Sequence, residues 1–152
     1  MKTSVKFTVL LVACLLMAGA AYAKFAKPED AIKYRKSVMF LIAQHFKGMG
    51  AVVQGKMDYD KNAFAANAEV VKVLATLPWE AALEPGTDKG DTTMSSAVFS
   101  KTAEFEKTAQ AFEMATEKLS QASQGSDFNA IKSEFGNVAK SCKECHKPFR
   151  TK

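Results

Sequence analysis

Residues 128–149 read FNAIKSEFGNVAKSCKECHKPF, and this stretch decides the fold class. Its apolar residues recur at alternating spacings of three and four, which places them on one face of an α-helix. The members of this stripe are Phe128, Ile131, Phe135, Val138, Cys142, Cys145 and Phe149. Both cysteines therefore belong to the buried face of an amphipathic helix. His146, four residues after Cys142, lies one turn further along on nearly the same side.

The same helix carries a Cys-x-x-Cys-His box, from Cys142 to His146. Such a box is the attachment signature of a c-type haem, in which two cysteines add across the vinyl groups and the imidazole ligates the iron. A zinc site would need four ligands, but the only other cysteine and histidine are Cys14 and His45. A redox dithiol of the thioredoxin kind needs a βαβ pattern, which we do not find. We therefore expect one covalent haem c per chain, attached through Cys142 and Cys145 and ligated by His146.

The first 23 residues have the pattern of a secretory signal peptide. Two lysines give a basic start, residues 7–17 form an apolar run, and residues 21–23 (Ala-Tyr-Ala) form a small-x-small cleavage site. The run is short for a bilayer span, and it continues well past Cys14, whereas a lipid-attachment cysteine would close it. We expect a signal peptide at 1–23, a single mature domain at 24–152 and no membrane anchor after cleavage.

Charge gives little support for a nucleic-acid partner. The sequence has 21 basic and 16 acidic residues, and loss of Lys2 and Lys6 with the signal peptide would leave 19 basic residues. Two haem propionates would bring the holoprotein close to neutrality, and no basic patch is interleaved with aromatic residues. We therefore expect no binding to nucleic acid.

The first mature helix begins at Pro28, which suits a first helical turn, and runs at least to Gly48. Two adjacent stripes make its apolar surface broad, so that one could line a core and the other a partner subunit. The core stripe is Ile32, Arg35, Met39, Ile42 and Phe46. The second stripe is Ala31, Tyr34, Val38, Leu41 and His45.

Two more helices are expected between the first helix and the box. One begins after Asp60 as N-cap and stops at Pro78, and an irregular stretch follows as far as Ser95. The next ends at Gly125, and Ser126 can cap the last helix. The seam of the third helix is Val98, Phe105, Phe112 and Leu119, at intervals of seven. Four such helices and no strand pattern predict an all-α antiparallel four-helix bundle with a covalently bound haem.

The chain resembles the class II cytochromes c, above all the cytochrome c′ family, over the whole mature region. The matching segments are residues 25–31 (FAKPEDA) with Tyr34-Arg35, residues 77–79 (LPW) with 85–87 (PGT), and the box followed by Phe149-Arg150. Class I cytochromes carry the box near the N-terminus instead. The resemblance implies a periplasmic homodimer built from the first two helices, with covalent haem c and His146 as proximal ligand.

The resemblance places the distal side of the iron at Met39, four residues after Arg35. In cytochrome c′ that residue is bulky and apolar and covers an iron left five-coordinate. In relatives of the cytochrome c-556 type, a methionine at the same spacing ligates the iron. A thioether is capable of either. We favour the five-coordinate arrangement because the flanking sequence looks more like cytochrome c′.

The resemblance assigns four further residues to the haem. Arg35 would pair with a propionate, whereas an arginine in an apolar stripe more often extends its head to water. Lys36 and Asp91 align with positions that approach the haem edge, with a solvated surface position as the alternative. Arg150, one turn after His146, aligns with a basic residue of the proximal face that modulates ligand access.

Together these features predict a binding and redox protein rather than an enzyme. A crowded apolar distal face admits small uncharged gases such as nitric oxide and carbon monoxide. Electron transfer with redox partner proteins is the companion role, and a low-spin His-Met carrier with Met39 as sixth ligand is the alternative. Catalysis of the peroxidase kind needs a distal acid-base group, which the haem-facing stripe does not offer, since His45 lies on another face.

Overall fold

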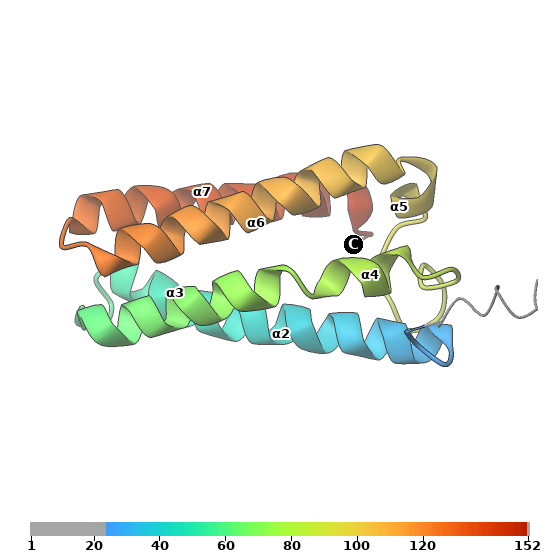
Figure 1. Cartoon of the computed structure of the whole chain (residues 1–152), viewed down its shortest axis with the longest axis horizontal. Helices are drawn as coiled ribbons and strands as arrows, with labels where there is room; N and C mark the ends of the chain where they lie inside the picture. The colour runs from blue at the N-terminus through green and yellow to red at the C-terminus, as the bar shows by residue number, and fades with distance from the viewer. Residues whose placement is uncertain (1–23, 152) are drawn as a thin grey trace, which may run out of the picture.

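A computed structural model describes residues 24–151 and confirms the all-α antiparallel bundle (Figure 1). The predicted signal peptide lies outside these residues. The four long helices are α2 (Pro28–Val53), α3 (Lys61–Ala75), α6 (Thr102–Gln124) and α7 (Phe128–Phe149). Two short helices, α4 (Pro78–Leu83) and α5 (Ala97–Ser100), lie in the connection between α3 and α6. Within 24–151 there is no strand, only an isolated antiparallel bridge between Met94 and Arg150.

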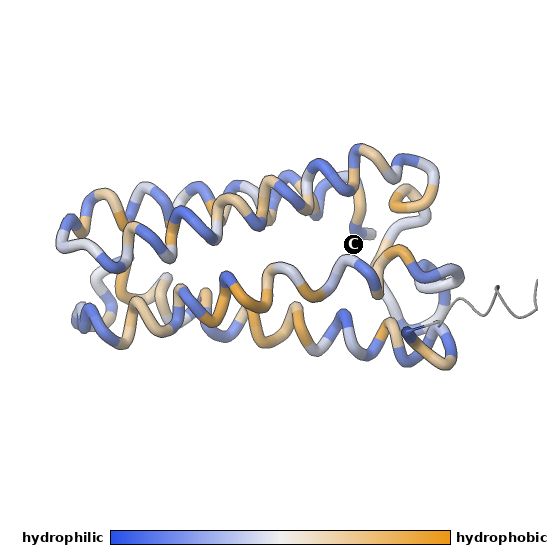
Figure 2. Tube along the Cα trace, in the orientation of Figure 1, coloured by the Kyte–Doolittle hydropathy of each residue, from blue (hydrophilic) through white to orange (hydrophobic). Residues whose placement is uncertain are grey.

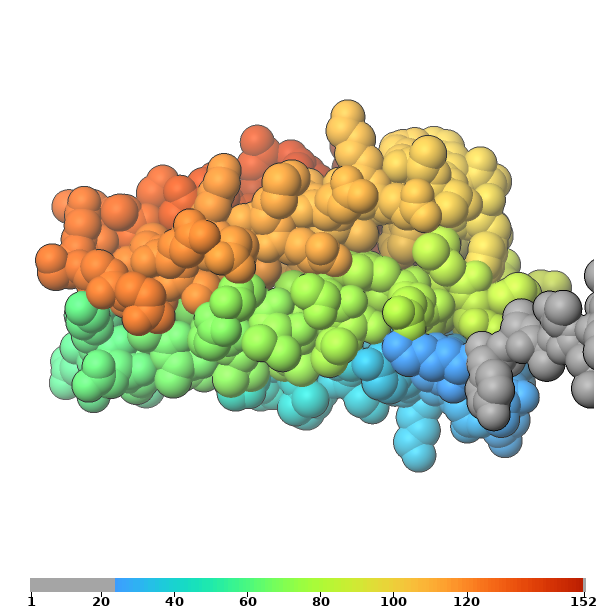
Figure 3. Space-filling view, in the orientation of Figure 1, coloured from blue at the N-terminus to red at the C-terminus, as the bar shows by residue number. Residues whose placement is uncertain are grey.

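The long helices pack as two pairs. In Figure 1, α2 and α3 form the lower layer and α6 and α7 the upper one, and Figure 3 shows α6 lying along α3. Hydrophobic and hydrophilic residues alternate along every helix (Figure 2), so each helix buries one stripe. The main cluster consists of Val38, Ile42, Met49, Phe64, Ala68, Val71, Ala75, Phe112, Leu119, Ile131 and Val138. A second cluster is made of Ala82, Val98, Phe105 and Phe149. No helix in the described part of the chain is long and apolar enough to span a membrane.

Local capping explains where the helices begin. Pro28 occupies the first turn of α2, as predicted. Asp60 caps α3, since its carboxylate accepts a hydrogen bond of 3.0 Å from the amide of Ala63. The prediction of Ser126 as the cap of α7 is wrong by one residue. Asp127 takes that position, and its Oδ1 accepts from the amides of the second and third helical residues at 2.9 and 3.2 Å.

The segment that follows α3 is more regular than predicted. Helix α3 ends at Ala75, and Pro78 opens α4 instead of only terminating the helix before it. Amide hydrogens in the first turn of a helix have no partner within the helix, so the one that proline lacks is not missed there. The fixed φ of proline also suits that turn. A break at Lys101, where φ is −133° and ψ is 44°, separates α5 from α6. The expected irregular stretch at 78–95 therefore includes one helical turn and a half at its start.

The broad surface of α2 is divided differently from the two predicted stripes. Ala31 and Val38, expected on the outer stripe, are buried in the bundle at 0% and 5% exposure. Exposed apolar side chains are Phe40 and Leu41, at 61% and 44%. The helix meets α3, α4 and α7 along different parts of its length, so the buried face does not follow a single stripe. Phe99 in the short α5 is also exposed, whereas its neighbour Val98 is buried.

Candidate functional site

The Cys-x-x-Cys-His box lies in the last two turns of α7, where both clusters meet. Cys142 is half-buried and packs against the main cluster, and Cys145 is half-buried against the second cluster. The hydroxyl of Thr108 on α6 lies 3.4 Å from the Cys145 sulfur. The two cysteines are thus held on one side of α7, facing the interior of the bundle, as the stripe predicted.

Burial sets the acidity of both thiols. It raises the pKa of Cys142 to about 11, opposed in part by a backbone hydrogen bond. It raises the pKa of Cys145 as well, opposed by the hydrogen bond with Thr108. Reactive redox cysteines have a lowered pKa, so these shifts are opposite to those of a thioredoxin-like dithiol.

His146 and Arg150 form a pair at the end of α7. The side chain of His146 reaches solvent, yet partial burial lowers its pKa, and the nearby charge of Arg150 lowers it further. Arg150 is the C-cap of α7 with an extended backbone, and its amide donates to the carbonyl of His146 at 3.1 Å, so it directly follows the turn that carries the imidazole. The guanidinium is therefore close enough to act on the imidazole electrostatically.

Met39 lies on α2, in the other layer of the bundle from the box on α7. It is half-buried, and it packs against the same main cluster as Cys142. The structure therefore brings the predicted distal residue and the first cysteine to the edge of one apolar cluster. The buried residues of that cluster are all apolar, which suits a thioether and an uncharged ligand.

Arg35 is buried, at 7% exposure, so its head does not extend to water. Its guanidinium donates to the carbonyl oxygens of Ala81 and Thr87, at 3.2 and 3.1 Å, and to Oγ1 of Thr92 at 2.8 Å. Burial lowers the pKa of Arg35, and an arginine guanidinium stays protonated in proteins. Arg35 thus fastens the segment after α3 to α2, and this contact was not predicted from the sequence.

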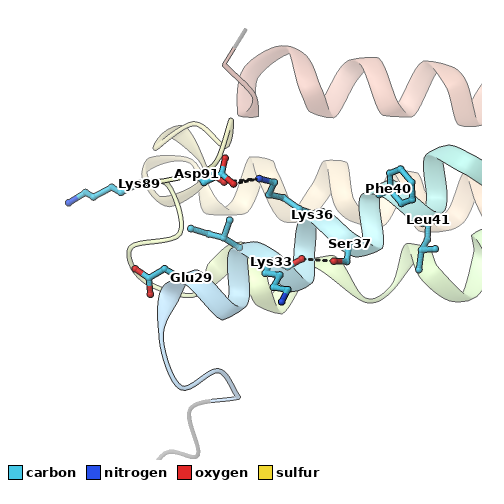
Figure 4. A pocket seen from close by; sticks show the side chains of 10 residues that line it. Glu29, Lys33, Lys36, Ser37, Phe40, Leu41, Lys89 and Asp91 are labelled. Carbon is cyan, nitrogen blue, oxygen red and sulfur yellow. Dashed lines mark hydrogen bonds and ion pairs between the residues drawn. The ribbon is translucent and has the colours of Figure 1, made fainter.

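Lys36 and Asp91 contact each other at the surface. The ammonium of Lys36 lies 2.6 Å from a carboxylate oxygen of Asp91, and it also donates to the Asp91 carbonyl at 3.1 Å. Figure 4 shows the pair beside an open groove of about 620 Å³, with the exposed ring of Phe40 further along. The ion pair is a surface contact, and its predicted place at a haem edge stays a prediction.

Three threonines at this end of the bundle were not singled out in the sequence. Thr108 contacts Cys145, and Thr92 accepts from Arg35. The carbonyl of Thr93 accepts from the amide of Thr151 at 2.8 Å, and its Oγ1 accepts from Nε of Arg150 at 3.1 Å. The only available signal was a Thr-Thr pair in a loop, which is too common to mark a site.

Trp79 has a buried indole N–H without a hydrogen-bond partner in the described part of the chain, and this feature bears on whether the site fits a haem. Its ring packs against both clusters and lies edge-on to Phe105 and Phe112, with centroids 5.9 and 6.1 Å apart. Among residues 24–151 its Nε1 is the only buried side-chain nitrogen or oxygen that lacks a hydrogen-bond partner. A buried N–H without an acceptor is costly, and the carboxylate of a propionate would satisfy it. The donor set of thiols, imidazole and apolar walls fits a haem c.

The described residues contain no second candidate site for a metal ion. No group of three His, Cys, Asp or Glu side chains gathers in the described residues. His45 is half-buried, with its Nδ1 2.7 Å from Oδ1 of Asn67, which ties α2 to α3. Because that oxygen is an acceptor, Nδ1 carries the proton in this contact. His45 thus contacts α3, and its predicted place on a face other than the haem-facing one stays a prediction.

Comparisons with known proteins give one consistent result. Residues 30–150 match the family model described as Cytochrome C'. The sequence is 45% identical over 129 residues to the cytochrome c' of Alcaligenes xylosoxydans xylosoxydans, covering 85% of this chain and 99% of that protein. Among solved structures, cytochrome c prime from Shewanella frigidimarina is similar, with a TM-score of 0.82 and 37% identity over 85% of this chain and all of that one.

Structures of cytochrome c prime from Alcaligenes xylosoxidans are similar too, with a TM-score of 0.79 and 43% identity over 85% of this chain and at least 99% of theirs. One is a nitric oxide complex of a leucine-to-alanine variant, and another is a carbon monoxide-bound leucine-to-glycine variant. The family match, the four-helix architecture and the Cys-x-x-Cys-His box in α7 agree, and this chain belongs to the cytochrome c′ family of haem proteins.

Proposed function

We propose that this chain is a periplasmic haem c protein with five-coordinate iron, which binds nitric oxide and carbon monoxide and transfers electrons. One haem would be attached through Cys142 and Cys145, with His146 as the proximal ligand. The observation that carries the proposal is that Met39 and Cys142 pack on one apolar cluster, so the distal side is lined by groups without charge. Two variants of one relative with this fold have been solved, one with nitric oxide bound and the other with carbon monoxide.

The distal face supports gas binding rather than catalysis. Met39 occupies the haem-facing stripe of α2, and the nearest cation on that stripe, Arg35, already donates to three oxygens of the segment after α3. Neither side chain is an acid or base with a pKa near neutrality, as peroxidase chemistry requires. A polar or anionic ligand would lose its hydration on this face without gaining a hydrogen-bond partner.

Haem itself supplies the iron that binds the gas and changes oxidation state. The residues of this chain would anchor and orient it. The indole N–H of Trp79 is free to donate to a propionate. The Arg35 guanidinium is a second candidate donor, although it already donates to Thr92 in the loop. Arg150, beside His146, would act on the proximal side.

A visible spectrum of the purified holoprotein tests the coordination state. Five-coordinate iron predicts high-spin spectra in both oxidation states. A low-spin spectrum with a methionine-sulfur charge-transfer band would instead support the alternative, a cytochrome of c-556 type with Met39 as sixth ligand. Absence of haem staining on a denaturing gel would contradict the proposal as a whole.

Replacement of Met39 by alanine tests its role directly. If Met39 covers the iron, Met39→Ala removes a steric obstacle, and carbon monoxide and nitric oxide bind faster in stopped-flow measurements while the iron stays high-spin. If Met39 ligates the iron, the same change abolishes a low-spin state. Met114→Ala is the matched control, because Met114 is 60% exposed on α6 and should leave both rates unchanged.

We also propose that the protein is a homodimer through α2 and α3. Four large apolar side chains are exposed on these two helices, namely Phe40, Leu41, Val70 and Val73. Exposed apolar side chains at this density favour association with a second apolar surface. The family resemblance supplies the symmetric partner, a second copy of the chain.

A further inference from the structure

A pair of adjacent threonines connects the two sides of the proposed haem site. Thr92 and Thr93 lie in the loop between α4 and α5, and their side chains contact different helices. Oγ1 of Thr92 accepts from Arg35 on α2 at 2.8 Å, whereas Oγ1 of Thr93 accepts from Arg150 at the end of α7 at 3.1 Å. The two adjacent hydroxyls thus accept from arginines of two different helical segments.

The loop is fixed to α7 by its backbone as well. The amide of Ser95 donates to the carbonyl of Phe149 at 3.0 Å, and the amide of Thr151 donates to the carbonyl of Thr93 at 2.8 Å. Phe149 is buried at 4% exposure and packs edge-on against Phe105, so this attachment rests on the second cluster. The Thr93 side chain therefore stands on a rigid support and is not part of a free loop.

Arg150 itself has few other restraints. Its side chain is exposed, and its contact with Oγ1 of Thr93 is the one side-chain hydrogen bond it makes within residues 24–151. An exposed arginine without such a contact samples many rotamers, and its charge is then spread through solvent. Arg150 follows His146 by one helical turn, so the direction of its guanidinium decides how much positive charge the imidazole meets.

We propose that Thr93 is a positioning residue that holds the Arg150 guanidinium beside His146 and thereby raises the reduction potential of the haem iron. This inference rests on the proposed ligation by His146. A fixed positive charge near the proximal ligand favours ferrous over ferric iron, because the ferrous state carries one positive charge less. Partners beyond the first ligand commonly tune a metal centre in this way.

Replacement of Thr93 by valine tests the proposal in the holoprotein. Thr93→Val keeps the shape of the side chain and both backbone hydrogen bonds but removes the acceptor for Arg150. We expect a lower ferric/ferrous midpoint potential by redox titration. We also expect faster exchange of the Arg150 Nε–H with solvent by NMR of the diamagnetic ferrous carbon monoxide form. Thr93→Ser keeps the acceptor and should restore both values.

Two further variants separate positioning from a general effect on the loop. Thr151→Val removes only the hydroxyl contact with the Thr93 carbonyl, at 3.1 Å, and should leave the potential unchanged. In an Arg150→Gln background, Thr93→Val should have no further effect on the potential, since the charge it positions is gone. An equal fall in that background, or an unchanged Nε–H exchange rate in Thr93→Val, would overturn the proposal.

The Nε–H measurement also separates this inference from the proposed function. It reports the contact between Thr93 and Arg150 whether or not His146 ligates the iron. A protein whose spectrum shows another proximal ligand would contradict the proposed function while leaving the contact intact. A protein with His146 ligation but a freely exchanging Arg150 would contradict the inference alone.

Discussion

Among single residues, Arg35 has the contacts least visible in the sequence. The helical periodicity predicted its position in an apolar stripe. Its hydrogen-bond partners, however, are oxygens that lie 46, 52 and 57 positions further along the chain. Two of them are backbone carbonyls, which exist at every position and leave no mark in a sequence pattern. The stripe therefore predicted an unusual arginine and could not predict that it fastens a loop.

Loss of Arg35 should destabilise the protein by more than loss of its neighbour. Arg35→Met leaves the carbonyls of Ala81 and Thr87 without their donor in a buried place, and we expect a loss of about 1–3 kcal/mol. Lys36→Met removes an exposed ion pair and should change stability by no more than about 0.5 kcal/mol. Urea unfolding of both variants measures the difference, and equal losses would contradict the role of Arg35.

A second residue, Glu69, gives the fold a dependence on pH. Hydrogen bonds from Lys72 and Ser120, at 2.7 Å each, lower its pKa. A lowered pKa in the folded state means that the contribution is present above the unfolded pKa, about 4.3, and is lost as the pH falls through the folded value.

Glu69→Gln should therefore be less stable than the native protein at pH 7, and the difference should shrink as the pH falls below about 4. Urea midpoints at pH 7 and pH 3 measure this change. The control Glu104→Gln alters a carboxylate whose Lys101 partner lies 3.6 Å away on the same short segment. A difference for Glu69→Gln that stays constant with pH would show that its charge plays no part.

At the level of the helices, α7 shows what periodicity captures. Seven residues at spacings of three and four predicted its buried face and its length, because one stripe controls the whole helix. Its cap was predicted one residue too early, at Ser126, because serine and aspartate are both good caps and only geometry selects Asp127. The short α4 was missed for a similar reason, because Pro78 can either end a helix or begin one.

Substitution can show which of Ser126 and Asp127 caps α7. Asp127→Ala removes the acceptor for two amides of the first turn, and we expect it to cost about 1 kcal/mol of stability. Ser126→Ala changes an exposed residue outside the cap and should stay within about 0.5 kcal/mol of the native protein. Thermal unfolding followed by circular dichroism measures both, and a larger loss for Ser126→Ala would reverse the assignment.

For the whole molecule, the bundle was predictable and its exposed surface was not. Four apolar stripes and the position of the box fixed the architecture, because every helix must bury its stripe against others. The outward face of α2 depended on how three neighbours share that helix. The sequence therefore predicted a broad apolar surface but assigned Ala31 and Val38 to the wrong part of it.

The proposed dimer makes a prediction at this scale. Leu41→Glu places a charge on the exposed apolar surface of α2, and we expect the dimer to dissociate, as measured by sedimentation velocity across a range of concentrations. Met114→Glu adds the same charge at an exposed position on α6 and should leave the mass unchanged. A native protein that sediments as a monomer at all concentrations would contradict the dimer.

The hydrogen bonds between the loop and the end of α7 also offer a local probe of opening motions. The amides of Ser95 and Thr151 donate across a contact between residues more than fifty positions apart, outside the regular helices. Their hydrogen exchange therefore reports separation of the loop from α7, while amides in the middle of α6 report unfolding of the bundle. Comparing the two classes of amide gives the free energy for opening this end of the molecule separately from the free energy of global unfolding.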